Sequence, residues 1–291
     1  MSKNLNMKIL KRLLIFGGTF LIIALAWILL QEPSNYRNWS FDQSVLPYVE
    51  IKGDVMKVSS VRDFRYGFDP LADKSAPRII PLSEEYQDRE YDLESLKSLD
   101  YIVVPFTDQI GAHTMLSFGF EDGRYLAVSV EIRKEEGENF SALRGLFNQF
   151  EIMYVIADER DVIDLRARYR NDEVFLYPVK SDDEGRRKIL LDIMKRTQGL
   201  YEEPEFYNTA FNNCTTSIVG HANQVYQEPI EWDWSFVLPE HSDQLAYSLG
   251  LLDVPQGLTI EDLREQYRIS DRAKTLVVDE FYSQNLRALA Y

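Results

Sequence analysis

TMLSFGF (residues 114–120) and YLAVSVEIR (residues 125–133) decide the fold of this chain. Both segments mix β-branched, aromatic and small residues, and the four residues EDGR separate them. Two strand-like segments around a short turn that contains Asp-Gly predict an antiparallel hairpin. A turn of this length sets the pairing register so that Glu131 stands opposite His113.

Further short strands and a few helices surround this hairpin in the sequence. Strand-like segments lie at residues 49–51, 55–58, 101–105, 151–156 and 174–179. Helices are predicted at residues 94–99, 163–170 and 188–200. Strands with helices flanking them predict an α+β fold with a mostly antiparallel sheet.

The amino-terminal residues predict a membrane anchor. Residues 1–12 carry four basic side chains and no acidic one, so we expect a cytoplasmic basic tail. Residues 13–30 (LLIFGGTFLIIALAWILL) are long and apolar enough for one transmembrane helix, and no small-residue cleavage site follows them. We therefore expect an uncleaved anchor, a linker at residues 31–38, and one domain at residues 39–291 on the outer side of the membrane.

Composition excludes several classes of function. The 32 basic and 47 acidic residues among 291 give a net charge of -15, which argues against a protein that binds nucleic acid. A single cysteine excludes a disulfide framework, a multi-cysteine zinc site and a CxxC redox motif. Three scattered histidines show no metal-ligand spacing, so we expect neither a metal nor a cofactor.

That single cysteine, Cys214, lies where an apolar helical pattern begins. Asn212 or Asn213 is suited to cap this helix. The first turn of a helix favours a thiolate and offers backbone N–H groups to an oxyanion. Cys214 is therefore a candidate nucleophile, and Asn212, Asn213, Thr215 and Thr216 either support it or cap the helix. The alternative is a small buried hydrophobic residue, which is a common role for a lone cysteine.

A thiol nucleophile needs a base, and His113 is the candidate. His221 is seven residues beyond Cys214 on the same predicted helix, roughly 10 Å along its axis, which is too far for proton transfer. His241 follows a proline in a loop-like segment. His113 begins the hairpin strand, on one face of the predicted sheet.

The partner strand of the hairpin offers a group to orient the imidazole. Glu131 is the first candidate because the register places it opposite His113, and Ser129 on the same face is the second. Tyr154, in the following strand, is a further polar candidate near the site.

Three stretches carry a resemblance to a known family. They are HTMLSFGFEDGRYLAVSVEIRKEEGE at 113–138, LRGLFNQFEIMYVIADERDVIDLRARYR at 143–170 and PEFYNTAFNNCTT at 204–216. The sequence resembles the Lnb N-terminal periplasmic domain from about residue 39 to residue 291. Its order of histidine then cysteine is similar to permuted papain-like enzymes, including the lecithin retinol acyltransferase and NlpC-type groups. The resemblance implies a nucleophilic Cys214 and a basic His113.

The resemblance also implies acyl chemistry at the bacterial envelope, because the named group of the family is a lipoprotein N-acyltransferase. We expect a single-pass inner-membrane protein with a periplasmic domain, which forms a Cys214 thioester and acts as an acyltransferase or an acyl hydrolase. The expected substrate is a membrane lipid or a lipoprotein. In that named group the periplasmic domain precedes several membrane helices, which makes an integral-membrane partner a candidate further component here. The alternatives are a cell-wall peptide amidase or peptidase and a non-catalytic envelope scaffold.

Overall fold

The computed structural model describes residues 11–12, 15–19, 26, 28, 30–73, 77–106, 111–226 and 228–288. Residues 1–10 of the predicted basic tail and residues 13, 14, 20–25, 27 and 29 of the predicted anchor lie outside this set. Within the described residues, no helix is both long and apolar enough to span a bilayer. The anchor at residues 13–30 therefore stays a prediction.

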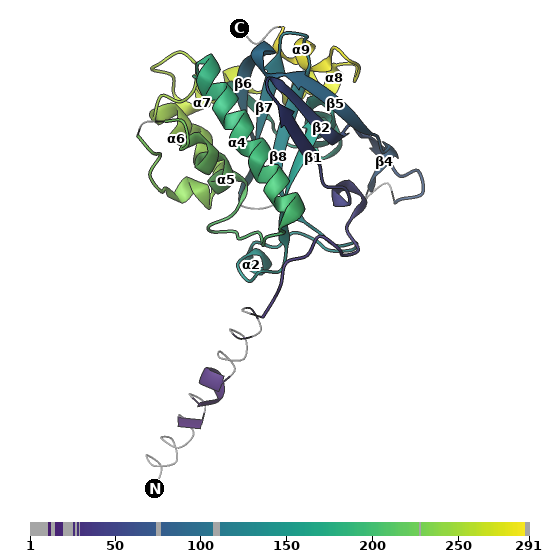
Figure 1. Ribbon diagram of the computed structural model, residues 1–291, viewed down its shortest axis with the longest axis vertical. Helices are drawn as coiled ribbons and strands as arrows, with labels where there is room; N and C mark the ends of the chain where they lie inside the picture. The colour runs from purple at the N-terminus through teal and green to yellow at the C-terminus, as the bar shows by residue number, and fades with distance from the viewer. Residues whose placement is uncertain are drawn as a thin grey trace.

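One large sheet organises the domain (Figure 1). Its strand order is β1 (Tyr48–Lys52), β2 (Val55–Arg62), β9 (Glu151–Asp158), β8 (Tyr125–Arg133), β7 (Ala112–Phe120), β6 (Leu96–Pro105) and β10 (Phe175–Pro178), with β5 (Tyr86–Asp92) also paired to β2. Only β2 and β9 pair in parallel among these strands. A separate two-stranded sheet contains β3 (Arg65–Phe68) and β4 (Ile79–Ser83). The predicted α+β fold with a mostly antiparallel sheet is confirmed.

Helices cover both faces of the large sheet. The first face carries α4 (Asp183–Glu202), α5 (Cys214–Ala222), α6 (Ser242–Ser248) and α7 (Ile260–Tyr267). The second face carries α3 (Glu159–Asp164), the π-helical turn η3 (Leu165–Tyr169), α8 (Ser270–Thr275) and α9 (Tyr282–Arg287). The short helix α2 (Ala142–Gly145) lies at the end of the domain nearest the amino-terminal segment (Figure 1). Single 3-10 turns are η1 (Phe41–Gln43), η2 (Leu93–Ser95), η4 (Trp234–Phe236) and η5 (Pro239–His241).

Successive side chains of β7 pack into two separate cores, one on each face of the sheet. Leu116 and Phe118 are buried against α4 and α5, whereas Met115, the residue before Leu116, is buried against α3 and α8. Because successive side chains of a strand point to opposite faces, a strand with helices on both sides is apolar along its whole length. The apolar hairpin that the sequence shows is thus the centre of the sheet.

The hairpin itself is confirmed in position, and its register is confirmed as far as the pair Met115 and Ser129. Its turn contains Gly123 at a φ of 83°, a left-handed conformation that glycine adopts without strain. Gly119 is required for a different reason, since a Cβ there would lie 2.3 Å from the Ser98 hydroxyl and 2.6 Å from the ring of Tyr125.

The helix predicted at residues 94–99 is wrong. Asp92 caps a single 3-10 turn, Leu93–Ser95, and strand β6 begins directly afterwards at Leu96. Pairing of Leu96 with Phe120 extends the central sheet by several residues. Hydrogen bonds between β6 and β7, and burial of Leu96 and Leu99 in the core on the first face of the sheet, therefore outweigh the weak local preference for a helix.

The other two predicted helices are present at 163–170 and 188–200. Both begin earlier than the sequence indicates: α3 begins at Glu159 and α4 at Asp183. The caps are Asp158 and Asp182, whose carboxylates accept hydrogen bonds from the first turn of each helix.

Residues 31–38, predicted to be a linker, are attached to the domain. The backbone N–H of Ser34 donates to the Glu151 carboxylate over 3.0 Å. The side-chain amide of Asn35 donates to the carbonyls of Leu200 and Tyr201, at the end of α4. The ordered domain therefore includes this segment, and little free chain separates it from the predicted anchor.

Candidate active site

A gap in the sheet creates the candidate site. Strand β7 pairs with β8 only as far as Met115 and Ser129, although β6 follows β7 to the pair Pro105 and Ala112. Strand β8 also stays paired with β9 to its last residue. The two central strands therefore part at the start of β7, and side chains from both faces of the sheet meet there.

A cleft of about 760 Å³ occupies this end of the sheet. Cys214 lines it from α5 on the first face, and His113, Glu131 and Arg166 line it from the second. Clefts of this size commonly hold small-molecule substrates. The structure thus brings the predicted nucleophile, base and orienting carboxylate to one cleft.

Helix α5 begins at Cys214, as the sequence predicts. Asn213 caps it through a reciprocal pair of bonds: its carboxamide oxygen accepts from the backbone N–H of Thr216, and its own N–H donates to the Thr216 hydroxyl. Cys214 is 6% exposed. The first N–H groups of a helix have no backbone partner inside it, and because the cap takes that of Thr216, those of Cys214 and Thr215 are the candidates to bind an anion beside the thiol.

His113 is held by a relay rather than by a direct carboxylate contact. Its Nε2 lies 2.7 Å from the Ser129 hydroxyl oxygen, and that hydroxyl donates to Glu131 over 2.8 Å. Glu131 Oε1 is 3.8 Å from Nε2. The prediction that Glu131 faces His113 directly therefore needs correction: because β7 and β8 have parted here, the serine two residues earlier fills the space between them.

The relay fixes the tautomer of His113. Glu131 is ionised and can only accept hydrogen bonds, so the single hydroxyl proton of Ser129 points toward it. The serine oxygen then accepts from His113, which places the ring proton on Nε2 and leaves Nδ1 with its lone pair. A histidine in this state can take a proton through Nδ1.

Buried charges around the relay set its protonation. Burial opposes ionisation of Glu131, but the positive charges of Arg166 and Arg62 outweigh it and hold the pKa of this carboxyl well below its ordinary value. Arg166 donates to Glu131 over 3.2 Å and the Gln43 carboxamide donates to it over 3.1 Å. Burial, followed by the charge of Arg166, lowers the pKa of His113 to about 3, so the imidazole is neutral at physiological pH.

A pair of threonines joins the two halves of the site. The Thr114 and Thr215 hydroxyls lie 3.1 Å apart, and both side chains are buried. Thr114 follows His113 in β7, and Thr215 follows Cys214 in α5. No hydrogen bond links the thiol and the imidazole among the described residues, and this contact directly joins the start of α5 to the start of β7.

The remaining predicted residues have mostly structural contacts. Asn212 donates from its carboxamide to the carbonyl of Phe206, which closes the turn before α5. Tyr154 is not among the residues that line the cleft; its hydroxyl lies 2.8 Å from Nε2 of His221, whose Nδ1 is 2.7 Å from Asp192. Within the described part of the chain, no group of three histidine, cysteine or acidic side chains is arranged to hold a metal.

Sequence reasoning did not find two of the residues that hold Glu131. Gln43 lies 88 positions and Arg166 lies 35 positions away from it in the chain. The only local signal is Arg166 itself, an arginine within the buried apolar pattern of α3 and η3, since a buried arginine requires an anionic partner.

The fold and the cleft define a class: an α+β protein with one cysteine at a helix start and a serine- and carboxylate-supported histidine beside it. Residues 83–237 match the family described as the Lnb N-terminal periplasmic domain, and the chain belongs to this family. The matched region includes both Cys214 and His113. No curated protein and no solved structure matches the chain. The family indicates a periplasmic domain, and likeness to permuted papain-like enzymes stays a prediction.

Proposed function

We propose that this protein is a membrane-anchored cysteine acyltransferase or acyl hydrolase that works through a thioester on Cys214. One observation carries the proposal: Cys214, at the start of α5, shares a cleft with a histidine whose Nε2 is held by a serine and an ionised carboxylate. The cleft thus holds the three kinds of group that nucleophilic catalysis uses: a nucleophile, a base, and a third group that orients the base.

Acylation would use each of these groups once. Nδ1 of His113 takes the proton of Cys214 as the sulfur attacks the ester carbonyl of a lipid, and first-turn N–H groups of α5 bind the oxyanion. When the tetrahedral intermediate collapses, the C–O bond breaks and His113 returns the proton to the alcohol that leaves. The product is an acyl thioester on Cys214.

Deacylation decides between the two activities. His113 accepts a proton from the attacking amine or water, the C–S bond breaks, and His113 returns the proton to the Cys214 sulfur. Attack by an amine yields an amide and makes the protein a transferase, whereas attack by water yields a free fatty acid and makes it a hydrolase. Because the pKa of His113 is about 3, the imidazole of the resting site is neutral and can accept a proton as the sulfur attacks. An integral-membrane partner that presents the acceptor would fit a chain with one predicted anchor.

Intact-mass spectrometry of the full chain with mixed phospholipids in detergent tests the proposal. We expect the wild type to gain one acyl chain that hydroxylamine removes, Cys214→Ala to gain none, and Ser129→Ala to gain it at least tenfold more slowly because the tautomer is no longer fixed. His241→Gln is the matched control, since His241 is exposed and outside the cleft.

Absence of an adduct and of phospholipid turnover in the wild type would refute the lipid reaction. Soluble peptidoglycan fragments are then the substrate to test, because a cell-wall amidase would use the same Cys214 and His113. A scaffold would show neither activity and would keep its cellular phenotype in Cys214→Ala.

A further inference from the structure

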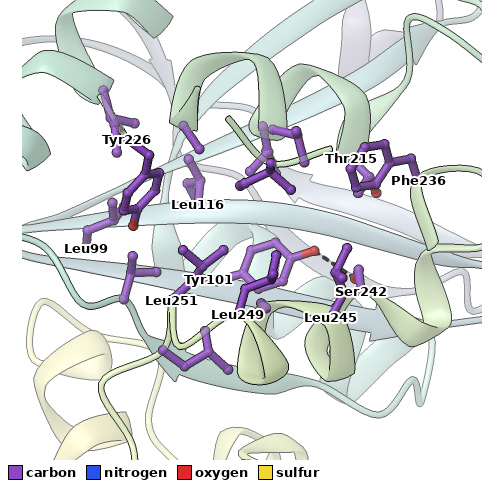
Figure 2. Close-up of a pocket in the computed structure, with 18 residues that line it drawn as sticks. Leu99, Tyr101, Leu116, Thr215, Tyr226, Phe236, Ser242, Leu245, Leu249 and Leu251 are labelled. Carbon is purple, nitrogen blue, oxygen red and sulfur yellow. Dashed lines mark hydrogen bonds between the residues drawn. The ribbon is translucent and has the colours of Figure 1, made fainter. Parts of the chain in front are cut away.

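A second cavity lies directly beyond Cys214, on the first face of the sheet. It is an open apolar groove of about 80 Å³ with β6 and β7 as its floor and α5 and α6 as its walls (Figure 2). Thr215, Phe236 and Ser242 lie at one end, and Leu99, Tyr226 and Leu251 lie at the other. The groove is therefore elongated.

The end at Thr215 meets the catalytic cleft. Cys214 lines the cleft, and Thr215, the next residue, lines the groove. Val237 likewise lines the cleft, and its neighbour Phe236 lines the groove. The carboxamide of Asn213 donates to the carbonyl of Phe236. The cleft and the groove therefore adjoin at the start of α5, where an elongated group attached to the Cys214 sulfur would enter the groove from the first face of the sheet.

The polar side chains of the groove already have partners. Thr215 contacts Thr114, and the Tyr101 hydroxyl donates to Ser242 over 2.7 Å (Figure 2). Tyr226, at the far end, donates to a backbone carbonyl. A peptide would bring N–H and C=O groups that find no partner here, and each such group costs free energy when it is buried. An alkyl chain brings none.

The length of the groove fits a chain of moderate length. Thr215, Ile218, Val219 and Ala222 form its α5 wall at helical spacing, and seven residues of helix extend roughly 10 Å. Carbon–carbon bonds of about 1.5 Å allow roughly eight extended methylene groups over this distance.

We propose that this groove binds the acyl chain carried by Cys214 and that Ala222, at its far end, sets the preferred chain length. The proposal rests on the function proposed above, because it states where the acyl part of that substrate binds. The headgroup side of the substrate then occupies the cleft, and the alkyl side occupies the groove.

Chain-length-dependent labelling of Cys214 tests the groove without requiring acyl transfer. Alkyl methanethiosulfonates react with the thiolate to form a mixed disulfide and release methanesulfinate, and Cys214 is the only cysteine in the chain. The rates with decyl and methyl reagents are measured by intact mass on the full chain in detergent. Their ratio isolates the contribution of the alkyl chain.

Ala222→Leu is the test variant and Gly220→Leu the matched control. A side chain at Gly220 would enter open space on the same helix, so it leaves the groove unchanged. Each methylene kept out of an apolar site weakens binding about fourfold, so exclusion of two lowers the decyl-to-methyl ratio about fifteenfold in Ala222→Leu. We expect a change of less than about twofold in Gly220→Leu.

Equal ratios in Ala222→Leu and Gly220→Leu would overturn the proposal. If Ala222→Leu also loses methyl labelling, its fold is disturbed, and Ala246→Leu on α6 decides instead, with exposed Ser248→Leu as its control. A wild type that shows the chain-length effect but forms no thioester from phospholipid would keep the alkyl groove and refute the proposed reaction.

Discussion

The buried histidine of the relay makes the stability of the domain depend on pH. His113 has a pKa of about 3 in the folded protein, against about 6.5 in an unfolded chain. The unfolded chain therefore binds more protons between these values. The free energy of unfolding is constant above about pH 6.5 and falls as the pH is lowered from there toward 3. At pH 5 the difference corresponds to about 2 kcal/mol.

The assay is urea denaturation of the full chain in detergent, followed by tryptophan fluorescence, at pH 7.5 and pH 5.0. Other groups also titrate in this range, so the informative quantity is the difference between wild type and His113→Gln. We expect His113→Gln to lose about 2 kcal/mol less than the wild type on acidification. His241→Gln, which changes an exposed histidine, keeps the full dependence. If His113→Gln and wild type lose the same amount, His113 is not held neutral by its surroundings and the relay described above is wrong.

Two further substitutions test contacts that hold the domain together, both by urea denaturation. Arg287 in α9 binds the buried carboxylates of Asp100 and Glu159, so Arg287→Ala leaves two buried charges unpaired and is expected to cost about 3–5 kcal/mol, whereas Arg268→Ala, at a surface pair, costs less than about 1 kcal/mol. A small effect of Arg287→Ala would mean that α9 does not depend on this cluster. Asn213→Ala removes the cap of α5 and is expected to cost about 1–2 kcal/mol, and a neutral result would contradict the capping geometry.

The parts of the fold that the sequence predicts are those with local causes. The turn before Tyr125 needs a glycine at positive φ, and Gly123 stands there. The start of α5 is marked by Asn213, whose side chain caps the helix that begins at the next residue. Both signals act over a few residues, so their geometry follows from the neighbouring residue types alone.

The relay was predicted only in part because its geometry depends on distant contacts. The register of the hairpin correctly brings Ser129 and Glu131 near His113, but it does not show that the two strands part at this point. Because the strands separate, His113 contacts the hydroxyl of Ser129 instead of the carboxylate of Glu131. The helix prediction at 94–99 fails for a related reason, since pairing with β7 across the sheet determines the structure of Leu96.

The gap between β7 and β8 also reconciles two requirements that conflict within one cavity. An ionised Glu131 needs Arg166 and Gln43 as partners, and these groups are stable on the second face of the sheet, where they satisfy one another. An acyl chain needs surroundings without unpaired polar groups, and the groove beyond Cys214 on the first face provides them. If both were on one face, either the charges would border the alkyl chain or the chain would desolvate the charges. The sheet separates the two environments, and in the proposed reaction its gap is the place where the thiol on one side would exchange a proton with the imidazole on the other.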